Sequence, residues 1–123
     1  MSHQRIKSGN HLLFVTEPGG HIVRSGKPVE VTEDLSEGIQ VQPFYTIRIV
    51  GGNRVISEGA VTFKLIMKIN RVSFLVLDTL TLEPGEQFTR TYDVPGLMLA
   101  IKAEGEHGAG LNAVDVAVFG YKF

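Results

Sequence analysis

The sequence predicts an all-β protein: a single-domain antiparallel β-sandwich of jelly-roll type, preceded by a short N-terminal extension. Two stretches, 39–49 and 61–69, alternate apolar with polar residues. Period two is typical of strands that bury one face against a core, and no stretch shows the 3.6-residue period of an amphipathic helix. The 14 Gly and 5 Pro provide turns between many short strands. This combination favours a sandwich or a small barrel.

Length and composition exclude several classes of protein. The 123 residues suffice for one domain with one core, which we place at 11–123 after a polar arm at 1–10. The net charge is −1, and the sequence contains no block of Lys or Arg. We therefore expect no nucleic-acid binding. No apolar run approaches the roughly 20 residues that cross a bilayer, and we expect no membrane insertion. The absence of Cys removes disulfides and zinc–thiolate sites together.

The first half of the domain is predicted to contain four strands. Three short ones lie at 11–16, 21–25 and 29–33. The alternating stretch 39–49 is interpreted as one strand whose inward face includes Tyr45. Pro43 suits an edge or a bulge of this strand, because it cannot donate to a ladder. Gly51-Gly52-Asn53 is interpreted as the hairpin turn that follows.

The second half continues the same pattern to the end of the chain. After the strand at 61–69, four more strands are predicted at 72–82, 87–94, 97–104 and 111–123. Glu83-Pro84-Gly85-Glu86 turns the first of these into the second. The run Phe74-Leu75-Val76-Leu77 is apolar on both faces, which predicts a strand covered on both sides.

The last predicted strand has an unusual outward face. Val114, Val116 and Val118 form its natural core face, so Phe119, Tyr121 and Phe123 fall on the other side. We call these three residues the aromatic stripe. A contiguous stripe of this kind needs an explanation, whereas scattered apolar residues do not. Three explanations stay open: loops or the N-terminal segment cover the stripe, the phase of the strand shifts at Gly120, or another copy of the chain covers the stripe.

The N-terminal arm adds one candidate interface residue. Ile6 is the only apolar residue after Met1 in the polar stretch 1–10, which contains no secretory signal. Two readings stay open for this arm: it packs on its own sheet, or it docks in a neighbouring subunit. The predicted subunit interface is therefore Ile6, Phe119, Tyr121 and Phe123.

No catalytic or cofactor motif is present. The histidines at positions 3, 11, 21 and 107 are not at metal-ligand spacing, and no nucleophile elbow supports Ser/His/Asp catalysis. We therefore expect no enzyme activity, no metal and no cofactor. A carbohydrate-binding module would use exposed aromatic residues such as Tyr45, Phe119 and Tyr121, which keeps a surface polysaccharide as a candidate partner.

The segment LEPGEQFTRTYDV at 82–94, with the alternating 97–103 and the terminal 114–123, resembles the C-terminal half of endospore-appendage pilins. The matching positions are Glu83, Gly85, Phe88, Arg90, Ile101 and Tyr121. The resemblance covers about a third of the chain. It implies a small jelly-roll subunit that stacks into helical fibres through a flexible N-terminal connector. The best-known members cross-link through cysteines, which this chain lacks.

These observations favour a structural subunit that pairs with itself through β-strands and an N-terminal arm. The expected product is a fibre outside the cell or on a spore or particle surface, reached without a conventional signal peptide. A phage or virion jelly-roll protein and a carbohydrate-binding sandwich are the alternatives, followed by an enzyme of cupin type. Open sheet edges favour the first reading, because a neighbouring subunit can extend them.

Overall fold

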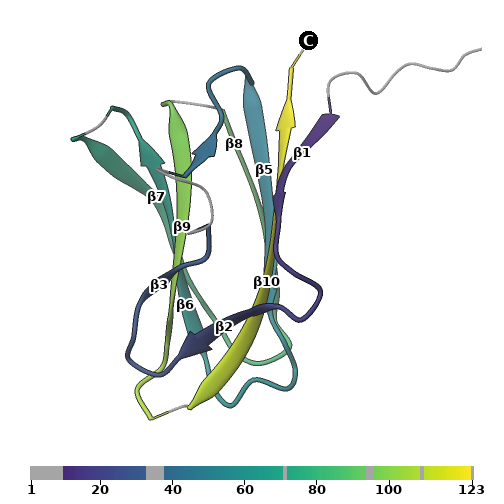
Figure 1. Ribbon diagram of the computed structural model, residues 1–123, viewed down its shortest axis with the longest axis vertical. Helices are drawn as coiled ribbons and strands as arrows, with labels where there is room; N and C mark the ends of the chain where they lie inside the picture. The colour runs from purple at the N-terminus through teal and green to yellow at the C-terminus, as the bar shows by residue number, and fades with distance from the viewer. Residues whose placement is uncertain (1–9, 33–37, 71, 94–95, 109, 123) are drawn as a thin grey trace, which may run out of the picture.

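The computed structural model describes residues 10–32, 38–70, 72–93, 96–108 and 110–122, and these residues contain strands and turns but no helix. Two antiparallel sheets face each other as a sandwich (Figure 1). The strands are β1 (Asn10–Val15), β2 (His21–Arg24), β3 (Val29–Glu30), β4 (Ile39–Gln40), β5 (Thr46–Asn53), β6 (Val61–Lys68), β7 (Phe74–Leu82), β8 (Gln87–Asp93), β9 (Met98–Gly105) and β10 (Leu111–Tyr121).

The strand order is that of a ribbon of antiparallel pairs rolled into two layers. The β10 sheet has the order β1-β10-β5-β8, and β2 also pairs with β10; the β9 sheet has the order β3-β9-β6-β7, and β4 also pairs with β9. Early strands thus pair with late ones, and the central pair β6–β7 closes the series. This arrangement is a jelly roll, as the sequence predicted.

The core lies between the two sheets and uses the alternation that the sequence shows. Val114, Val116 and Val118 are buried on the inner face of β10, as predicted. The side-chain amides of two buried asparagines link neighbouring segments of the sandwich through hydrogen bonds. Asn53 donates to the carbonyls of Gly59 and Leu82, and Asn112 donates to the carbonyl of Val23. These hydrogen bonds give partners to buried backbone carbonyls, which would destabilise the fold if they were left unpaired.

The alternating stretch 39–49 is two strands, which corrects the prediction of one. β4 belongs to the β9 sheet and β5 to the β10 sheet, and the chain crosses between them through a turn at Pro43. The alternation persists because Val41 and Ile47 point from opposite sheets into the same core. Tyr45, which the pattern placed inward, lies in the crossover and is 61% exposed.

Gly51-Gly52-Asn53 is also not the hairpin turn. These residues complete β5: all three pair with β10, and the two glycines also pair with β8. Gly51 is required there by close packing: a Cβ on it would lie 2.7 Å from the ring of Phe88. That ring packs on Phe63 with centroids 5.4 Å apart, so it has little freedom to move.

A polar clamp holds the two sheets together along one side of the sandwich. Asp78 of β7 accepts hydrogen bonds from Arg90 Nε at 3.0 Å and from the Tyr92 hydroxyl at 3.1 Å, both on β8. Burial alone would raise the pKa of Asp78. The bonds from Arg90 and Tyr92 and the charge of Arg90 outweigh it and hold the pKa below its usual value. We call these three residues the clamp.

The contact between Gly51 and Phe88 predicts that Gly51→Ala destabilises the domain by about 1–3 kcal/mol, because the added methyl overpacks a filled site. Urea unfolding measures the change. Gly19→Ala is the matched control, since a Cβ at Gly19 meets nothing within 4 Å. Equal stability of the two variants would contradict the packing argument.

The clamp predicts a pH dependence at the alkaline end. Burial and then the hydrogen bond to Asp78 raise the pKa of Tyr92 to about 12. Because this is higher than the value of about 10 for an unfolded chain, the stabilisation is complete below about pH 10 and is lost as the pH rises to about 12. In an ultraviolet titration, Tyr92→Phe should remove a transition near pH 12. The unfolding free energy of Tyr92→Phe should also decrease less between about pH 10 and pH 12 than that of the unmodified chain. Tyr45→Phe should keep the transition and the decrease in unfolding free energy.

Candidate assembly surfaces

Two of the predicted stripe residues, Phe119 and Tyr121, lie on the outer face of β10. From Val114 to Tyr121 buried and half-buried residues alternate without interruption, so no phase shift occurs at Gly120. Phe119 and Tyr121 are half-buried on the side opposite the valines. Two of the predicted interface residues, Ile6 and Phe123, lie outside the described residues.

Neighbouring strands extend this apolar surface sideways. Phe119 is paired with Leu12 of β1, and Ala117 with both Val15 of β1 and Val50 of β5. Leu12 is 57% exposed and Val15 is 56% exposed. We call this surface the outer patch; it consists of Leu12, Val15, Val50, Ala117, Phe119 and Tyr121. Residues directly opposite on one sheet face touch each other, so the patch is continuous.

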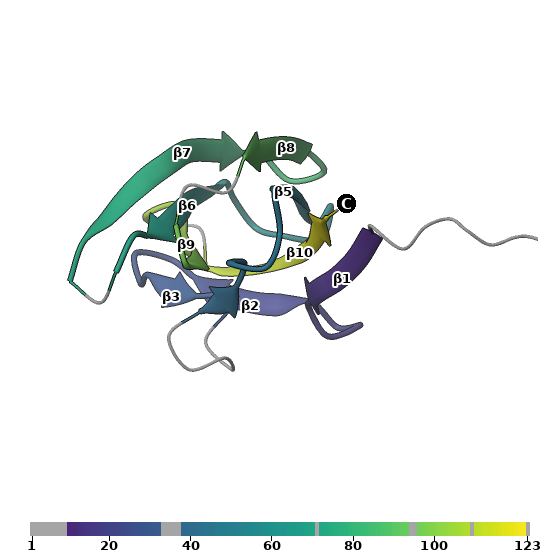
Figure 2. The same cartoon turned by 90° about the horizontal axis from the view of Figure 1, so that it is seen from above.

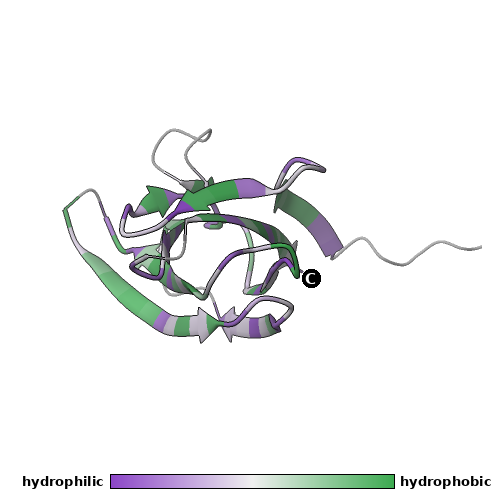
Figure 3. Cartoon of the chain, turned by 90° about the horizontal axis from the view of Figure 1, so that it is seen from below, coloured by the Kyte–Doolittle hydropathy of each residue, from purple (hydrophilic) through white to green (hydrophobic). Residues whose placement is uncertain are grey.

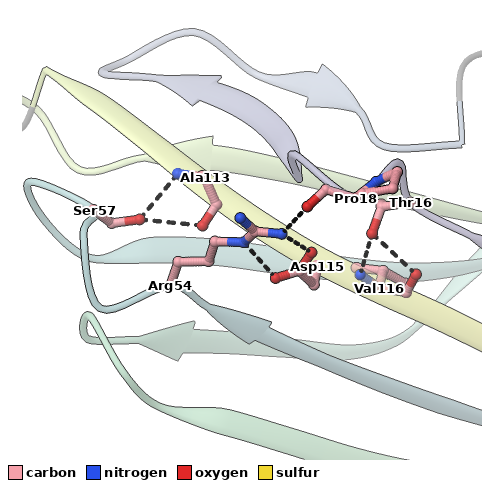
Figure 4. Close-up of polar contacts among 7 residues, drawn as sticks. All are labelled: Thr16, Pro18, Arg54, Ser57, Ala113, Asp115 and Val116. Atoms are coloured by element: carbon pink, nitrogen blue, oxygen red, sulfur yellow. Dashed lines mark hydrogen bonds and ion pairs between the residues drawn. The ribbon is translucent and has the colours of Figure 1, made fainter.

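The outer patch leads into a surface groove of about 740 Å³. Val15, Val50 and Ala117 belong to both, and the turn between β1 and β2 forms one wall of the groove. Figure 4 shows how Arg54 sets this wall. Its guanidinium donates to both carboxylate oxygens of Asp115, at 2.7 and 2.8 Å, and to the carbonyl of Pro18 at 2.7 Å.

The groove is lined by apolar and polar residues and by one ion pair. The Arg54–Asp115 pair is partly exposed, and such pairs contribute little to stability, so its role is to hold the turn in place. No aromatic ring is found among the described residues that line the groove. Within the described part of the chain, no group of three His, Cys, Asp or Glu side chains could hold a metal ion.

A second apolar surface lies at the hairpin of β6 and β7, where the sequence predicted a strand covered on both sides. That prediction is wrong. Phe74 is 61% exposed and Val76 is 47% exposed, because β7 is the edge strand of the β9 sheet. We call the exposed apolar residues of this hairpin the β7 tip: Ile69, Val72, Phe74, Leu75 and Val76. In Figures 2 and 3, the first part of β7 lies on the side of the molecule away from β1 and the end of β10, and this part is hydrophobic.

Sequence reasoning missed the β7 tip and the β1 side of the outer patch. A continuous apolar run does not say whether its strand is central or at an edge. One signal was available: the run follows directly on a tight turn. Asn70 makes this turn by accepting hydrogen bonds from the amides of Val72 and Ser73.

The resemblance positions prove to be structural residues of the domain. Phe88 and Ile101 are core residues, Arg90 belongs to the clamp, and Gly85 adopts a left-handed conformation with φ 92° in the predicted turn. Tyr121 belongs to the outer patch, and Gly85 also lines the groove. The described residues form no helix long and apolar enough to cross a membrane.

No protein-family model matches the chain, and no curated protein matches it either. Among solved structures, it is similar to a chain from Bacillus endospore appendages, which form a novel family of disulfide-linked pili. The TM-score is 0.50 at 11% identity, over 100% of this chain and 99% of that one. It is also similar to the coat protein of Tobacco streak virus, with a TM-score of 0.48 at 13% identity, over 96% and 90% of the two chains. At such identity the likeness to the appendage chain shows the fold alone: the two chains share a jelly-roll architecture.

Proposed function

We propose that the chain is a structural subunit that assembles with copies of itself into a fibre outside the cell or on a spore surface. The observation that carries the proposal is the outer patch. Its residues are apolar, contiguous and partly exposed in the single chain, and Leu12 and Val15 are more than half exposed. Contiguous apolar surfaces of this kind on a soluble protein mark interaction sites. Phe119 and Tyr121 lie at the end of the patch, and a second copy covers them.

The N-terminal arm is attached at the same place. β1 begins at Asn10, which is paired with Tyr121 near the end of β10. An arm attached there starts beside the outer patch. We propose that it reaches a neighbouring subunit and that Ile6 is its apolar anchor.

The appendage structure supports the proposal at the level of the fold. That protein forms disulfide-linked pili, whereas this chain has no Cys. A fibre of this chain is therefore held by strand pairing and apolar contact alone. Each aromatic residue that an assembly buries contributes roughly 2–3 kcal/mol. Three of them per subunit suffice for a lasting contact.

Changing Phe119, Tyr121 and Phe123 together to Ser should leave the monomer folded and abolish large particles, because these side chains pack between subunits. Negative-stain microscopy and light scattering measure the particles, and circular dichroism measures the fold. Val116→Asp is the contrasting control. It places an unpaired charge in the core and should unfold the domain.

The same experiment separates the alternatives. A triple variant that still assembles, or that unfolds as Val116→Asp does, would show that the stripe is ordinary core. Closed shells in place of filaments would indicate a virion subunit. A monomer retained on a polysaccharide column would indicate a carbohydrate-binding module.

Removal of residues 1–9 should reduce assembly with little effect on the melting temperature. These residues precede β1, so their loss removes none of the described strands. Thermal unfolding and particle size are compared between the shortened and the full chain. A large drop in melting temperature would instead assign the arm to the fold of its own domain.

A further inference from the structure

We propose that copies of the chain stack end to end, with the β7 tip of one subunit packed against the opposite end of the next. This inference rests on the proposed function and adds a second contact to the outer patch. The partner on both sides is a second copy of this chain. Two features carry the inference: each end exposes apolar side chains, and the charges at the two ends have opposite signs.

The end of the subunit away from the β7 tip has an exposed apolar pair. Val55 is 80% exposed and Ile56 is 76% exposed, in the connection from β5 to β6. The turn between β7 and β8 lies beside them: the amide of Gly85 donates to the carbonyl of Asn53, and a Cβ on Gly85 would lie 3.5 Å from Val55. Among the large apolar residues that the structure describes, only Val72 in the β7 tip is more exposed.

Acidic side chains accompany this pair. Glu58 follows it in the chain, Glu83 and Glu86 belong to the adjacent β7–β8 turn, and all three are exposed. Neither ion pair found among the described residues includes any of the three. We call Val55, Ile56, Glu58, Glu83 and Glu86 the tail surface. It combines two exposed apolar side chains with three negative charges.

The β7 tip has the opposite charge. Lys68 ends β6 directly before the tip and is paired with Phe74 on the outer face of the β9 sheet. In the described part of the chain it takes part in neither ion pair. The sequence adds a second cation, Arg71, next to Val72. Asp93 also lies at this end, but it ends a strand of the other sheet. The tip therefore combines exposed apolar side chains with positive charge.

The β7 tip and the tail surface lie at opposite ends of one strand pair. β6 begins at Val61, after the tail residues 55–58, and ends at Lys68; β7 then returns to the turn that contains Glu83. The eight residues of β6 span about 25 Å, so one subunit cannot bring its own two surfaces together. A contact between two different surfaces at opposite ends leaves one of each free, and the next subunit extends the stack.

The tail surface fits the tip better than the outer patch does. Arg48 is exposed and is paired with Phe119 on the outer face of the β10 sheet. A tip packed there would bring Lys68 close to another cation. Charges across an interface select the surfaces that meet and reject like-charged ones. An anionic lipid surface would also match the tip, but it would leave the apolar, acidic tail surface without a partner.

Charge reversal at each end tests the contact. Lys68→Glu alone should raise the protein concentration needed for particles at least about tenfold, because like charges then meet. Glu83→Lys alone should do the same. An equimolar mixture of the two variants should assemble as the unmodified chain does, since each altered end then finds an altered partner and each unaltered end an unaltered one. Light scattering and negative-stain microscopy measure the particles, and restored assembly also shows that both variants are folded.

Glu86→Lys is a second tail variant, which allows for a different facing of the two ends. Single reversals that assemble as the unmodified chain does would overturn the contact and leave the proposed function standing. A mixture that stays unassembled with both tail variants would overturn it as well. If the unmodified chain forms no particles, both proposals fail.

The apolar part of the contact has its own variants and control. Val72→Ser and Ile56→Ser should each weaken assembly, whereas Ile22→Ser should not, because Ile22 is 48% exposed but belongs to neither surface. Vesicles of phosphatidylglycerol test the lipid alternative. If the unmodified chain binds them and Val72→Ser abolishes this binding while particles persist, the tip is a lipid contact and the stacking proposal is wrong.

Discussion

The alternation of side chains along β10 is the constraint on which the rest of the structure depends. β10 lies between β5 on one side and β1 and β2 on the other, so it connects most of its sheet. Val114, Val116 and Val118 fill the core, and period two then sends Phe119 and Tyr121 to the outer face. Their position cannot change without moving the core. The outer patch is therefore a direct consequence of how the core is packed.

The second constraint is that each of the two sheets is open and therefore ends in two edge strands. Two sheets of this kind have four, and each must be covered, protected or used. The clamp ties β7 to β8 through side-chain hydrogen bonds. Because its residues are polar and partly exposed, it fixes geometry more than it adds stability. The clamp holds β7 at the side of the molecule. The β7 tip lies away from the core, and its apolar side chains are exposed to solvent.

Much of the fold could be predicted from the sequence, since the pattern of turns and alternation indicated an all-β sandwich and most of its strands. The errors share one cause. Periodicity reports which side chains face a core but not which sheet contributes the strand, so 39–49 looked like a single strand although β4 and β5 lie in different sheets. For the same reason the run from Phe74 to Leu77 looked central although it forms an edge. Edge position depends on long-range pairing, which a local pattern does not encode.

The candidate surfaces were predictable to a smaller extent. The stripe follows from period two within one strand, so Phe119 and Tyr121 could be identified from the sequence. Leu12 and Val50 join it only because β1 and β5 pair with β10 in a particular register, far apart in the chain. This difference bears on how a fibre without disulfides could hold together. No single contact is covalent, so strength must come from surfaces built from several strands at once, and a subunit whose apolar surfaces lie on opposite sides can use both of them in every repeat.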